Sequence, residues 1–442
     1  MPMTKLILTL TTCLIALSGV FGQPLSQTIY TQDIDNFWTA FDSVQSTKDS
    51  SRQLFYIRSL YIDKGTAGLK AFMKARDYTA EGWVKAINQY PKFWASIRPN
   101  TLTVKTKTAE FTKSIAQLKK LYPELKDARL YFTIGCLHSG GTTDSNMVLI
   151  GAEIATGDST TDVSEFPNKW LATVFKGQSR ANKVPLNNIV PLNIHEYVHT
   201  QQQGENDILL PNAIKEGSAD FITELAIGRP MQTSYIKYGY EHEKELKEAF
   251  KQEMFTTSYQ KWLYNGSEAT TMADLGYFMG YTICKSYYKH SANKKAAVKA
   301  IIELNYSDSN AVESFLTRSA YYTEPINKAA LIAAFREKQP VLLRLEPFSN
   351  GDTLVDPTLK SLSFVFSKPM RPKGYSIEYG SGGKEHFPIK GVTGFSADGT
   401  TFSVKTELQP GRDYEFIISK RAFASQDGYA LQTDYTIKFR TK

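Results

Sequence analysis

The chain has 442 residues, which is too long for a single hydrophobic core and predicts two or three domains. Hydrophobic residues make up 42% and charged residues 22%, a composition that excludes a largely disordered chain. The formal net charge is +8, but the basic residues are scattered among acidic ones. This pattern argues against nucleic acid as a partner.

The first 22 residues have the pattern of a secretory signal peptide. Lys5 supplies the positive charge, and residues 6–16 form an apolar stretch too short to span a bilayer comfortably. Residues 20 and 22 offer small side chains at the two positions that a signal peptidase reads. An uncleaved membrane anchor is the alternative. We therefore expect export to a periplasm, a cell surface or the medium. We expect no transmembrane segment in the mature chain, because no other stretch stays apolar for 18 residues.

Two cysteines remain after removal of this segment, Cys136 and Cys284. In an oxidising compartment they could form a disulfide. Thiols so far apart in sequence are more often separate small core residues, which is the interpretation we favour. The residues alone leave the pairing open.

Residues 23–127 are predicted to be helical, because apolar side chains recur there at helical spacing. The recurring positions are Phe37, Trp38, Phe41, Val44, Phe111, Ile115, Leu118 and Leu121. Residues 128–136 and 146–154 then have the β-branched and aromatic content of strands, with a Gly/Ser/Thr loop at 139–143 between them. From residue 166 to about 335 the pattern is helical again. The predicted body is therefore a mainly helical α+β fold around a small sheet.

The pattern changes once more near Pro340. Apolar and polar residues alternate in short segments from residue 361 to residue 440, which predicts strands. Turn signals separate them, at Asn350-Gly351, Asp398-Gly399, Pro410-Gly411 and Asp427-Gly428. Several short strands at this spacing over about 100 residues are typical of an all-β sandwich. The alternating apolar positions are enough for a core of its own, so we expect this domain to fold independently.

The segment 193–199 (NIHEYVH) carries the strongest chemical signal. On a helix, His195 and His199 lie one turn apart on the same face, so both imidazoles can reach one cation. Glu196 lies between them and can reach a water on that cation without being a ligand. The alternative is a helix whose two histidines are simply partly exposed polar residues.

A second segment supplies a third ligand. Glu216 and Asp220 lie on the next predicted helix, four residues apart, so their carboxylates share a face. The small residues 217–219 would let this helix approach the first one closely. Two His and one Glu with water in the fourth position form an open zinc site of the catalytic kind, which predicts one Zn²⁺ per chain. Asp220 is suited to accept a hydrogen bond from the outer nitrogen of one His ligand.

These paired motifs, HEYVH at 195–199 and EGSAD at 216–220, resemble those of the gluzincin metallopeptidases, the thermolysin-like and aminopeptidase-like clan. The chain looks closest to a set of predicted bacterial zinc proteases. The resemblance covers about residues 125–290. It implies that zinc is held by His195, His199 and Glu216, and that Glu196 is the general base.

The same resemblance implies a tyrosine that donates to the oxyanion. Gluzincins often place a Tyr or His downstream of the ligands, and Tyr277, followed by Gly280, resembles the aminopeptidase pattern. Tyr277 is our first candidate and Tyr281 our second. The alternative is that these two tyrosines, four residues apart, pack in a core.

A further candidate is Glu153, in the segment 151–153 that closes the predicted strand at 146–154. Gluzincins use an edge strand in this place to align the substrate backbone. Glu153 could read a peptide N-terminus, but a solvated charge at a strand end is the interpretation we favour. The remaining histidines lack ligand partners at useful spacing and are interpreted as non-catalytic; these are His138, His242, His290 and His386.

The C-terminal domain resembles the bacterial Ig-like domains of secreted proteins. The resemblance rests on residues 362–370 (LSFVFSKPM), 408–414 (LQPGRDY) and 435–441 (YTIKFRT). Such modules are spacers or binding platforms, which implies contact with a surface or a glycan. We expect a chain ending near Gln339 to keep zinc and to cleave short peptides. The alternative is that the module packs on the protease and completes its substrate groove.

The sequence thus predicts four parts: a signal peptide (1–22), an N-terminal helical region (23–127), a gluzincin-like zinc peptidase domain (128–338) and an Ig-like β-sandwich (339–442). The predicted activity is hydrolysis of peptide or protein substrates by a zinc-activated water, with Glu196 as general base. One alternative is a secreted zinc-binding or adhesion protein with a non-catalytic site, against which the intact Glu196 argues. The other is a zinc hydrolase acting on a non-peptide substrate, such as a cell-wall cross-link or an ester.

Overall fold

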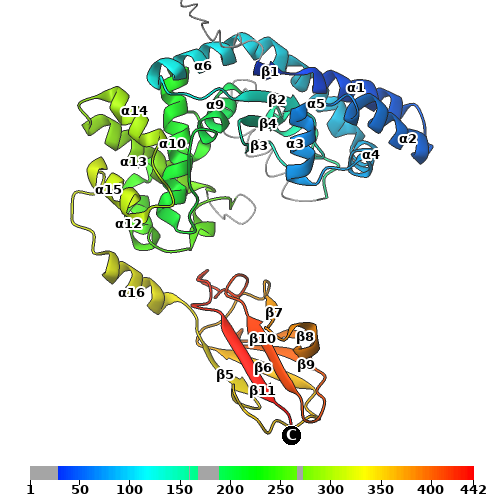
Figure 1. Cartoon of the computed structure of the whole chain (residues 1–442), viewed down its shortest axis with the longest axis vertical. Helices are drawn as coiled ribbons and strands as arrows, with labels where there is room; N and C mark the ends of the chain where they lie inside the picture. Colours follow the sequence, from blue (N-terminus) through cyan, green and yellow to red (C-terminus); the bar gives the residue numbers. More distant parts are fainter. Residues whose placement is uncertain (1–27, 159, 168–188, 266–271) are drawn as a thin grey trace, which may run out of the picture.

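The computed structural model describes residues 28–158, 160–167, 189–265 and 272–442. The expected signal peptide, residues 1–22, lies outside these residues. The described chain mixes helices and strands as predicted, and the sheets at its C-terminal end are separate from the sheet of the body. Figure 1 shows a broad, mainly helical body that is joined through helix α16 to a β-domain.

The first half of the body is a layer of helices. They are α1 (Gln32–Gln45), α2 (Ser50–Ile57), α3 (Ala67–Arg76), α4 (Ala80–Gln89), α5 (Pro91–Thr103) and α6 (Thr108–Leu121). A π-helical turn at Arg58–Ile62 extends α2, and a 3₁₀ turn at Val104–Lys107 joins α5 to α6. The side chains of Asp49, Thr66 and Thr79 cap α2, α3 and α4 by accepting hydrogen bonds from first-turn N–H groups.

One hydrophobic core runs through the whole body. Its buried residues extend from Ile34 to Tyr321, and fully buried aromatic rings such as Phe37 and Trp94 fill its N-terminal part. These two rings pack with centroids 5.2 Å apart. The predicted boundary between residues 127 and 128 is therefore not a break in the core.

A four-stranded sheet lies between the helices. Its strands are β1 (Ile29–Tyr30), β2 (Arg129–Thr133), β3 (Gly141–Asp144) and β4 (Met147–Gly151), and their order is β1-β2-β4-β3. β2 is parallel to both β1 and β4, whereas β3 is antiparallel to β4 and forms one edge. The chain turns directly from β4 into the short helix α7 (Ala152–Ala155).

The edge strand β3 corrects the prediction of a loop at residues 139–143. Glycines at 140 and 141 disfavour a strand in a local analysis, but the β-branched pair Thr142 and Thr143 is suited to one. Pairing with β4 decides the conformation, because Thr142 lies opposite Leu149 and Thr143 opposite Val148. The predicted loop is therefore reduced to a turn before Gly141.

The second half of the body is again helical. Its helices are α9 (Ile189–His199), α10 (Leu209–Ile227), α11 (Ser234–Glu241), α12 (Glu243–Glu253), α13 (Leu275–His290), α14 (Lys294–Ile302), α15 (Ser309–Ser319) and α16 (Lys328–Lys338). A 3₁₀ turn at Tyr259–Lys261 follows α12. Among the described helices, none combines the length and the apolar character needed to cross a membrane.

Helices α10 and α13 touch backbone to backbone. A Cβ atom on Gly280 of α13 would lie 1.7 Å from the carbonyl oxygen of Ala213, and one on Gly217 of α10 would lie 2.0 Å from the backbone nitrogen of Tyr281. Only glycine fits at these two points. The small residue Gly217 thus serves the contact of α10 with α13, not the predicted contact with α9.

The C-terminal domain contains two antiparallel sheets. Its strands are β5 (Leu342–Glu346), β6 (Ser361–Phe366), β7 (Ile377–Tyr379), β8 (Ile389–Phe395), β9 (Thr401–Thr406), β10 (Asp413–Ile418) and β11 (Tyr435–Arg440). One sheet has the order β5-β6-β9-β8 and the other β11-β10-β7. A 3₁₀ turn at Gly383–His386 precedes β8. The alternating residues of these strands form a second core that extends from Leu345 to Phe439.

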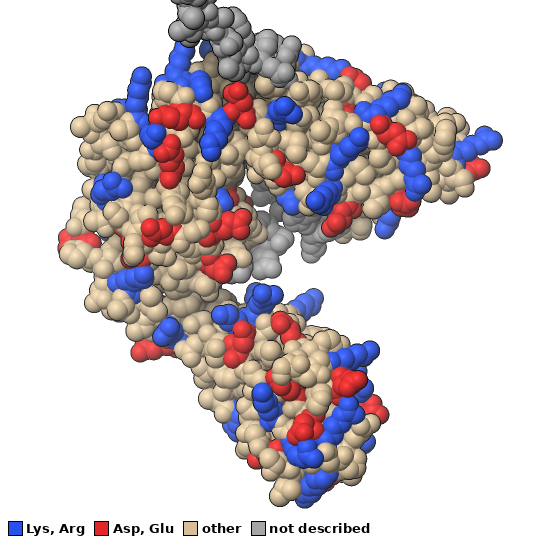
Figure 2. All heavy atoms as spheres, in the orientation of Figure 1, with Lys and Arg blue, Asp and Glu red and all other residues tan. Residues whose placement is uncertain are grey.

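Cys136 and Cys284 are both buried in the body and both free. The disulfide alternative is therefore wrong, and the two thiols are separate core residues. Charge is distributed evenly over the face of the molecule shown in Figure 2, where Lys and Arg alternate with Asp and Glu without a large area of one sign.

Candidate metal centre

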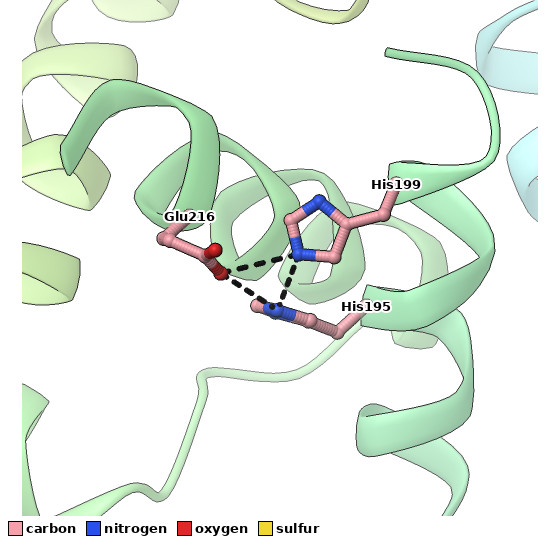
Figure 3. A group of neighbouring side chains, drawn as sticks. All are labelled: His195, His199 and Glu216. Carbon is pink, nitrogen blue, oxygen red and sulfur yellow. Dashed lines mark hydrogen bonds and ion pairs between the residues drawn. The ribbon is translucent and has the colours of Figure 1, made fainter. Parts of the chain in front are cut away.

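Two adjacent helices bring three metal-binding side chains together. His195 and His199 lie one turn apart on α9, and Glu216 lies on α10, facing them (Figure 3). The two Nε2 atoms are 2.9 Å apart, and Oε2 of Glu216 lies 3.1 Å from Nε2 of His199 and 3.5 Å from Nε2 of His195. The three predicted ligands thus converge on one point.

The donor set fits a zinc ion. Nitrogen and oxygen donors about 2.0–2.1 Å from a tetrahedral ion lie roughly 3.3 Å from one another, close to the separations seen here. His195 and Glu216 are each 8% exposed, and His199 is half-buried, so the group is sheltered yet reachable. Two imidazoles and one carboxylate leave a fourth coordination position open, as in catalytic zinc sites.

Each imidazole is oriented by a partner on its outer nitrogen. Nδ1 of His195 lies 2.8 Å from Oδ1 of Asp220, which is the position the spacing predicted for this aspartate. The hydroxyl of Tyr235 donates to the other oxygen of Asp220 at 2.8 Å. These contacts favour the tautomer of His195 that leaves Nε2 free for a metal.

Gln202 orients His199 in the same way, a role that the sequence pattern does not predict. Nδ1 of His199 lies 2.6 Å from Oε1 of Gln202, whose amide nitrogen donates to Oγ of Ser218 at 2.7 Å. Because Ser218 is on α10, this chain of hydrogen bonds links the two helices that carry the ligands. Three consecutive glutamines follow Thr200, so no local pattern distinguishes Gln202.

The charges of the three residues stabilise one another. Burial lowers the pKa of His195, but the carboxylates of Asp220 and Glu216 outweigh burial and hold that pKa well above its ordinary value. Burial raises the pKa of Glu216, but the two imidazoles outweigh it and hold that pKa well below its ordinary value. The site is therefore a strongly coupled cluster in which a cation, either proton or metal, neutralises the carboxylates.

Glu196 lies beside the three ligands without joining them. Its side chain is half-buried, and a Cβ atom on Gly141 of β3 would lie 3.6 Å from its Oε1 atom. Within the described residues, no hydrogen bond occupies its carboxylate. Glu196 therefore has a free carboxylate between the metal-binding histidines and the edge of the sheet.

Family comparison agrees with this geometry. Residues 159–308 match the model of a family described as "Predicted Zn-dependent protease (DUF2268)". This region is similar to a family of predicted zinc proteases. The match covers roughly a third of the chain and includes both helices that carry the three ligands. No curated protein matches the chain.

Solved structures add no argument about fold or function. The crystal structure of the S-layer protein rSbsC(31-844) is 14% identical, covers 95% of this chain and has a TM-score of 0.18. The N-terminal part of the bacterial S-layer protein SbsC is 12% identical over 95% of this chain, also with a TM-score of 0.18. The chain spans 45% of the length of the first of these structures and 78% of the second.

The edge strand beside Glu196 is β3, not the segment 151–153 that the sequence indicated. The N–H of Gly151 donates to the carbonyl oxygen of Gly140 at 3.2 Å. Such hydrogen bonds involve every second residue of an antiparallel strand. The backbone groups of Thr142 therefore point toward β4, whereas those of Gly141 and Thr143 point outward. No described strand pairs with this edge of the sheet, and the carbonyl oxygen of Gly141 accepts a hydrogen bond from the hydroxyl of Ser139 at 2.8 Å.

Tyr277 lies at the site. Its ring stacks on the ring of His195, with centroids 6.1 Å apart and planes at 21°. Burial, together with nearby Glu216, raises the pKa of Tyr277 well above its ordinary value, so the hydroxyl keeps its proton. No described residue forms a hydrogen bond with that hydroxyl.

Tyr281 does not face the three ligands. Its hydroxyl donates to Oε2 of Glu224 at 2.6 Å and accepts a hydrogen bond from Lys285 at 2.7 Å. Glu224 lies two helical turns beyond Glu216 on α10, about 12 Å along the axis. The second candidate for the oxyanion donor is therefore a core tyrosine, and the packing alternative describes it correctly.

Tyr264 is a contact of the site that the sequence did not reveal. Its hydroxyl donates to Oε1 of Glu216 at 2.5 Å, although the residue is 60% exposed. This bond leaves Oε2 of Glu216 for a metal. Tyr264 follows a single 3₁₀ turn and has a φ of 57°, so no helical or strand periodicity surrounds it.

The position of Glu153 contradicts both interpretations of this residue. It is completely buried, and its carboxylate accepts hydrogen bonds from the backbone N–H groups of Gly135 at 2.9 Å and of Leu137 at 3.3 Å. Glu153 is thus neither a solvated charge nor a group that a peptide N-terminus can reach. Burial raises its pKa to about 7. Its contacts hold the turn that leads from β2 toward β3.

Proposed function

We propose that the chain is a zinc-dependent metallopeptidase with one Zn²⁺ per molecule. The observation that carries this proposal is the convergence of His195, His199 and Glu216, with the free carboxylate of Glu196 beside them. The family match over residues 159–308 supports it independently. The likeness to gluzincins, through ligands on two successive helices, belongs to the same proposal.

Zinc held by His195, His199 and Glu216 would supply Lewis-acid chemistry for polarising a carbonyl oxygen and lowering the pKa of a water molecule. Glu196 takes the proton of the attacking water and delivers it to the departing amine. The protonated hydroxyl of Tyr277 donates a hydrogen bond to the negative charge that develops on the substrate carbonyl oxygen. Asp220 and Gln202 keep the two imidazoles in place during the reaction.

The edge of β3, with which no described strand pairs, supports a polypeptide as the substrate. An extended peptide can pair as an additional strand with the N–H of Gly141, which lies next to Glu196, and with the outward backbone groups of Thr143. A simple ester has no run of backbone N–H and C=O groups to pair with such an edge. A zinc-binding or adhesion protein would need neither this edge nor the free carboxylate of Glu196.

Export and the nature of the C-terminal domain complete the proposal. The pattern of residues 1–22 supports passage out of the cytoplasm. Two antiparallel sheets around a core of their own support an Ig-like sandwich. Contact of this sandwich with a surface or a glycan would place the enzyme near its substrate.

The test is a cleavage profile on a diverse peptide mixture. We expect the purified protein to cleave peptide bonds, to lose this activity with a zinc chelator and to regain it when Zn²⁺ is restored. Hydrolysis that continues unchanged in verified metal-free protein would exclude the mechanism. Hydrolysis of esters without any cleavage of peptides would exclude the substrate class but not the metal site.

A further inference from the structure

The β-domain touches the body close to the metal centre. The ammonium group of Lys261, in the 3₁₀ turn after α12, lies 3.7 Å from the centroid of the Tyr429 ring in the β-domain. A Cβ atom on Gly428 would lie 3.2 Å from Cε of Lys261, so the lysine stem crosses the same loop. Lys261 also forms an ion pair with Glu253 at 3.2 Å. The lysine is thus held between α12 and the β-domain.

Contacts with α16 and within the β-domain hold Tyr429 in place. The ring packs against Phe335 of α16 with centroids 5.5 Å apart, and its backbone N–H donates to Oγ of Ser425 at 3.1 Å. The side chain of Gln339 donates to the carbonyl of Ala430 at 3.1 Å, which fixes the end of α16 to the same loop. Figure 1 shows α16 as the connection between body and β-domain.

A short turn connects Lys261 to Tyr264. The side-chain amide of Asn265 donates to the carbonyl of Lys261 at 2.7 Å, and the N–H of Leu263 donates to the carbonyl of Tyr259 at 2.8 Å. These hydrogen bonds join residues 259–265 into one compact turn. At the other end of this unit, the hydroxyl of Tyr264 holds Oε1 of Glu216.

The backbone at Tyr264 shows why this unit needs support. Its φ of 57° lies in the left-handed region, which a bulky side chain rarely occupies and which persists only where the surroundings hold it. The residue is also 60% exposed, so its own burial contributes little to holding it. The buried side chains of Trp262 and Leu263 anchor the segment in the body, and Lys261 is its contact with the β-domain.

We propose that Tyr429 is a positioning residue of the metal centre. Its ring holds Lys261, this contact fixes residues 259–265, and the fixed segment holds Tyr264 on Glu216. The proposal rests on the proposed function in that Glu216 is a zinc ligand. It argues against the expectation that a chain ending near Gln339 keeps zinc and cleaves short peptides, and agrees with the alternative only in that the module packs on the protease, since no contact with a substrate groove is proposed.

The first test measures zinc affinity and kinetics in the full-length chain. We expect Tyr429→Ala to weaken zinc binding about tenfold in a chelator competition and to lower kcat with little change in KM. Tyr429→Phe keeps the ring and should restore both values. The control is Tyr379→Ala, which removes a more exposed tyrosine whose ring contact is with Phe387, inside the β-domain.

A second measurement does not depend on metal or activity. In the metal-free protein, amide hydrogen exchange at Leu263 should be faster in Tyr429→Ala than in wild type, because the segment is released. Lys261→Met should have the same effect, and the double variant should be no worse than either single one. Unchanged exchange and unchanged zinc affinity in a folded Tyr429→Ala protein, or additive effects in the double variant, would overturn the proposal.

These readouts separate the two proposals. A wild-type protein that binds zinc but cleaves no peptide would refute the proposed activity, while the affinity and exchange measurements would still decide the role of Tyr429. If wild-type protein bound no zinc, hydrogen exchange alone would decide whether Tyr429 fixes residues 259–265.

Discussion

At the scale of single residues, the two tyrosines that the sequence ranked together have separate roles. Tyr277 stacks on His195, and no described residue forms a hydrogen bond with its hydroxyl. The hydroxyl of Tyr281 is hydrogen-bonded to Glu224 and Lys285. Tyr277→Phe should therefore lower kcat, by roughly 10²-fold, more than it raises KM. Tyr281→Phe is the matched control and should lower the melting temperature while leaving kcat nearly unchanged. Equal kinetic losses in both variants would contradict this assignment.

Glu153 makes a prediction about pH. Its folded-state pKa of about 7 is above the ordinary 4.5, so the folded protein binds this proton more tightly than the unfolded chain does. The contribution of Glu153 to stability is fully present below pH 4.5 and is lost as the pH rises to about 7, by on the order of 3 kcal/mol. Urea unfolding of wild type and Glu153→Gln between these pH values measures it. A difference between the two proteins that does not change with pH would refute the shifted pKa.

The sequence predicts residues of the site where these residues are neighbours on one helix. His195, Glu196 and His199 follow from one helical turn, and Glu216 with Asp220 from another. Gln202, Tyr264 and Tyr429 reach the site through tertiary contacts, with no periodic pattern around them. The burial of Glu153 depends on Gly135 and Leu137, which are more than a dozen residues away in the chain.

At the scale of elements, the contact between α10 and α13 determines where Glu216 lies. Gly280→Ala would place a methyl group 1.7 Å from the carbonyl of Ala213, one turn before Glu216, so the two helices must separate. We expect a loss of about 3 kcal/mol in the free energy of unfolding, together with weaker zinc binding. Gly82→Ala in α4 is the control, because its nearest neighbours lie at an ordinary 3.4 Å. Wild-type stability in Gly280→Ala would contradict the close contact.

The sequence predicts helices and strands correctly where hydrophobic periodicity is strong, and less well where pairing with another strand determines the conformation. The helices of the body and most strands of the β-domain follow from spacing. β3 was missed because Gly140 and Gly141 disfavour a strand until β4 supplies its partner. A contact between α9 and α10 through small residues was expected, but Gly217 faces α13, since helical spacing does not specify which neighbour a face will meet.

At the scale of the whole molecule, two hydrophobic cores predict two folding units. The core of the β-domain is confined to residues 345–439 and contains alternating residues of both its sheets. We expect an isolated chain of residues 339–442 to unfold in one cooperative transition, measured by circular dichroism on heating. An isolated domain without a transition would mean that contacts such as Lys261 with Tyr429 are needed for its folding as well as for the site.

The central claim is that the three ligands hold zinc while Glu196 performs the proton transfer. The most direct measurement determines the zinc content and the rate of peptide hydrolysis of wild type and Glu196→Gln side by side. We predict one zinc per chain in both proteins and a rate at least ~10²-fold lower in the variant, because Glu196 is not a ligand but moves the proton. A wild-type protein without zinc, or a zinc-loaded Glu196→Gln protein with full activity, would contradict the account.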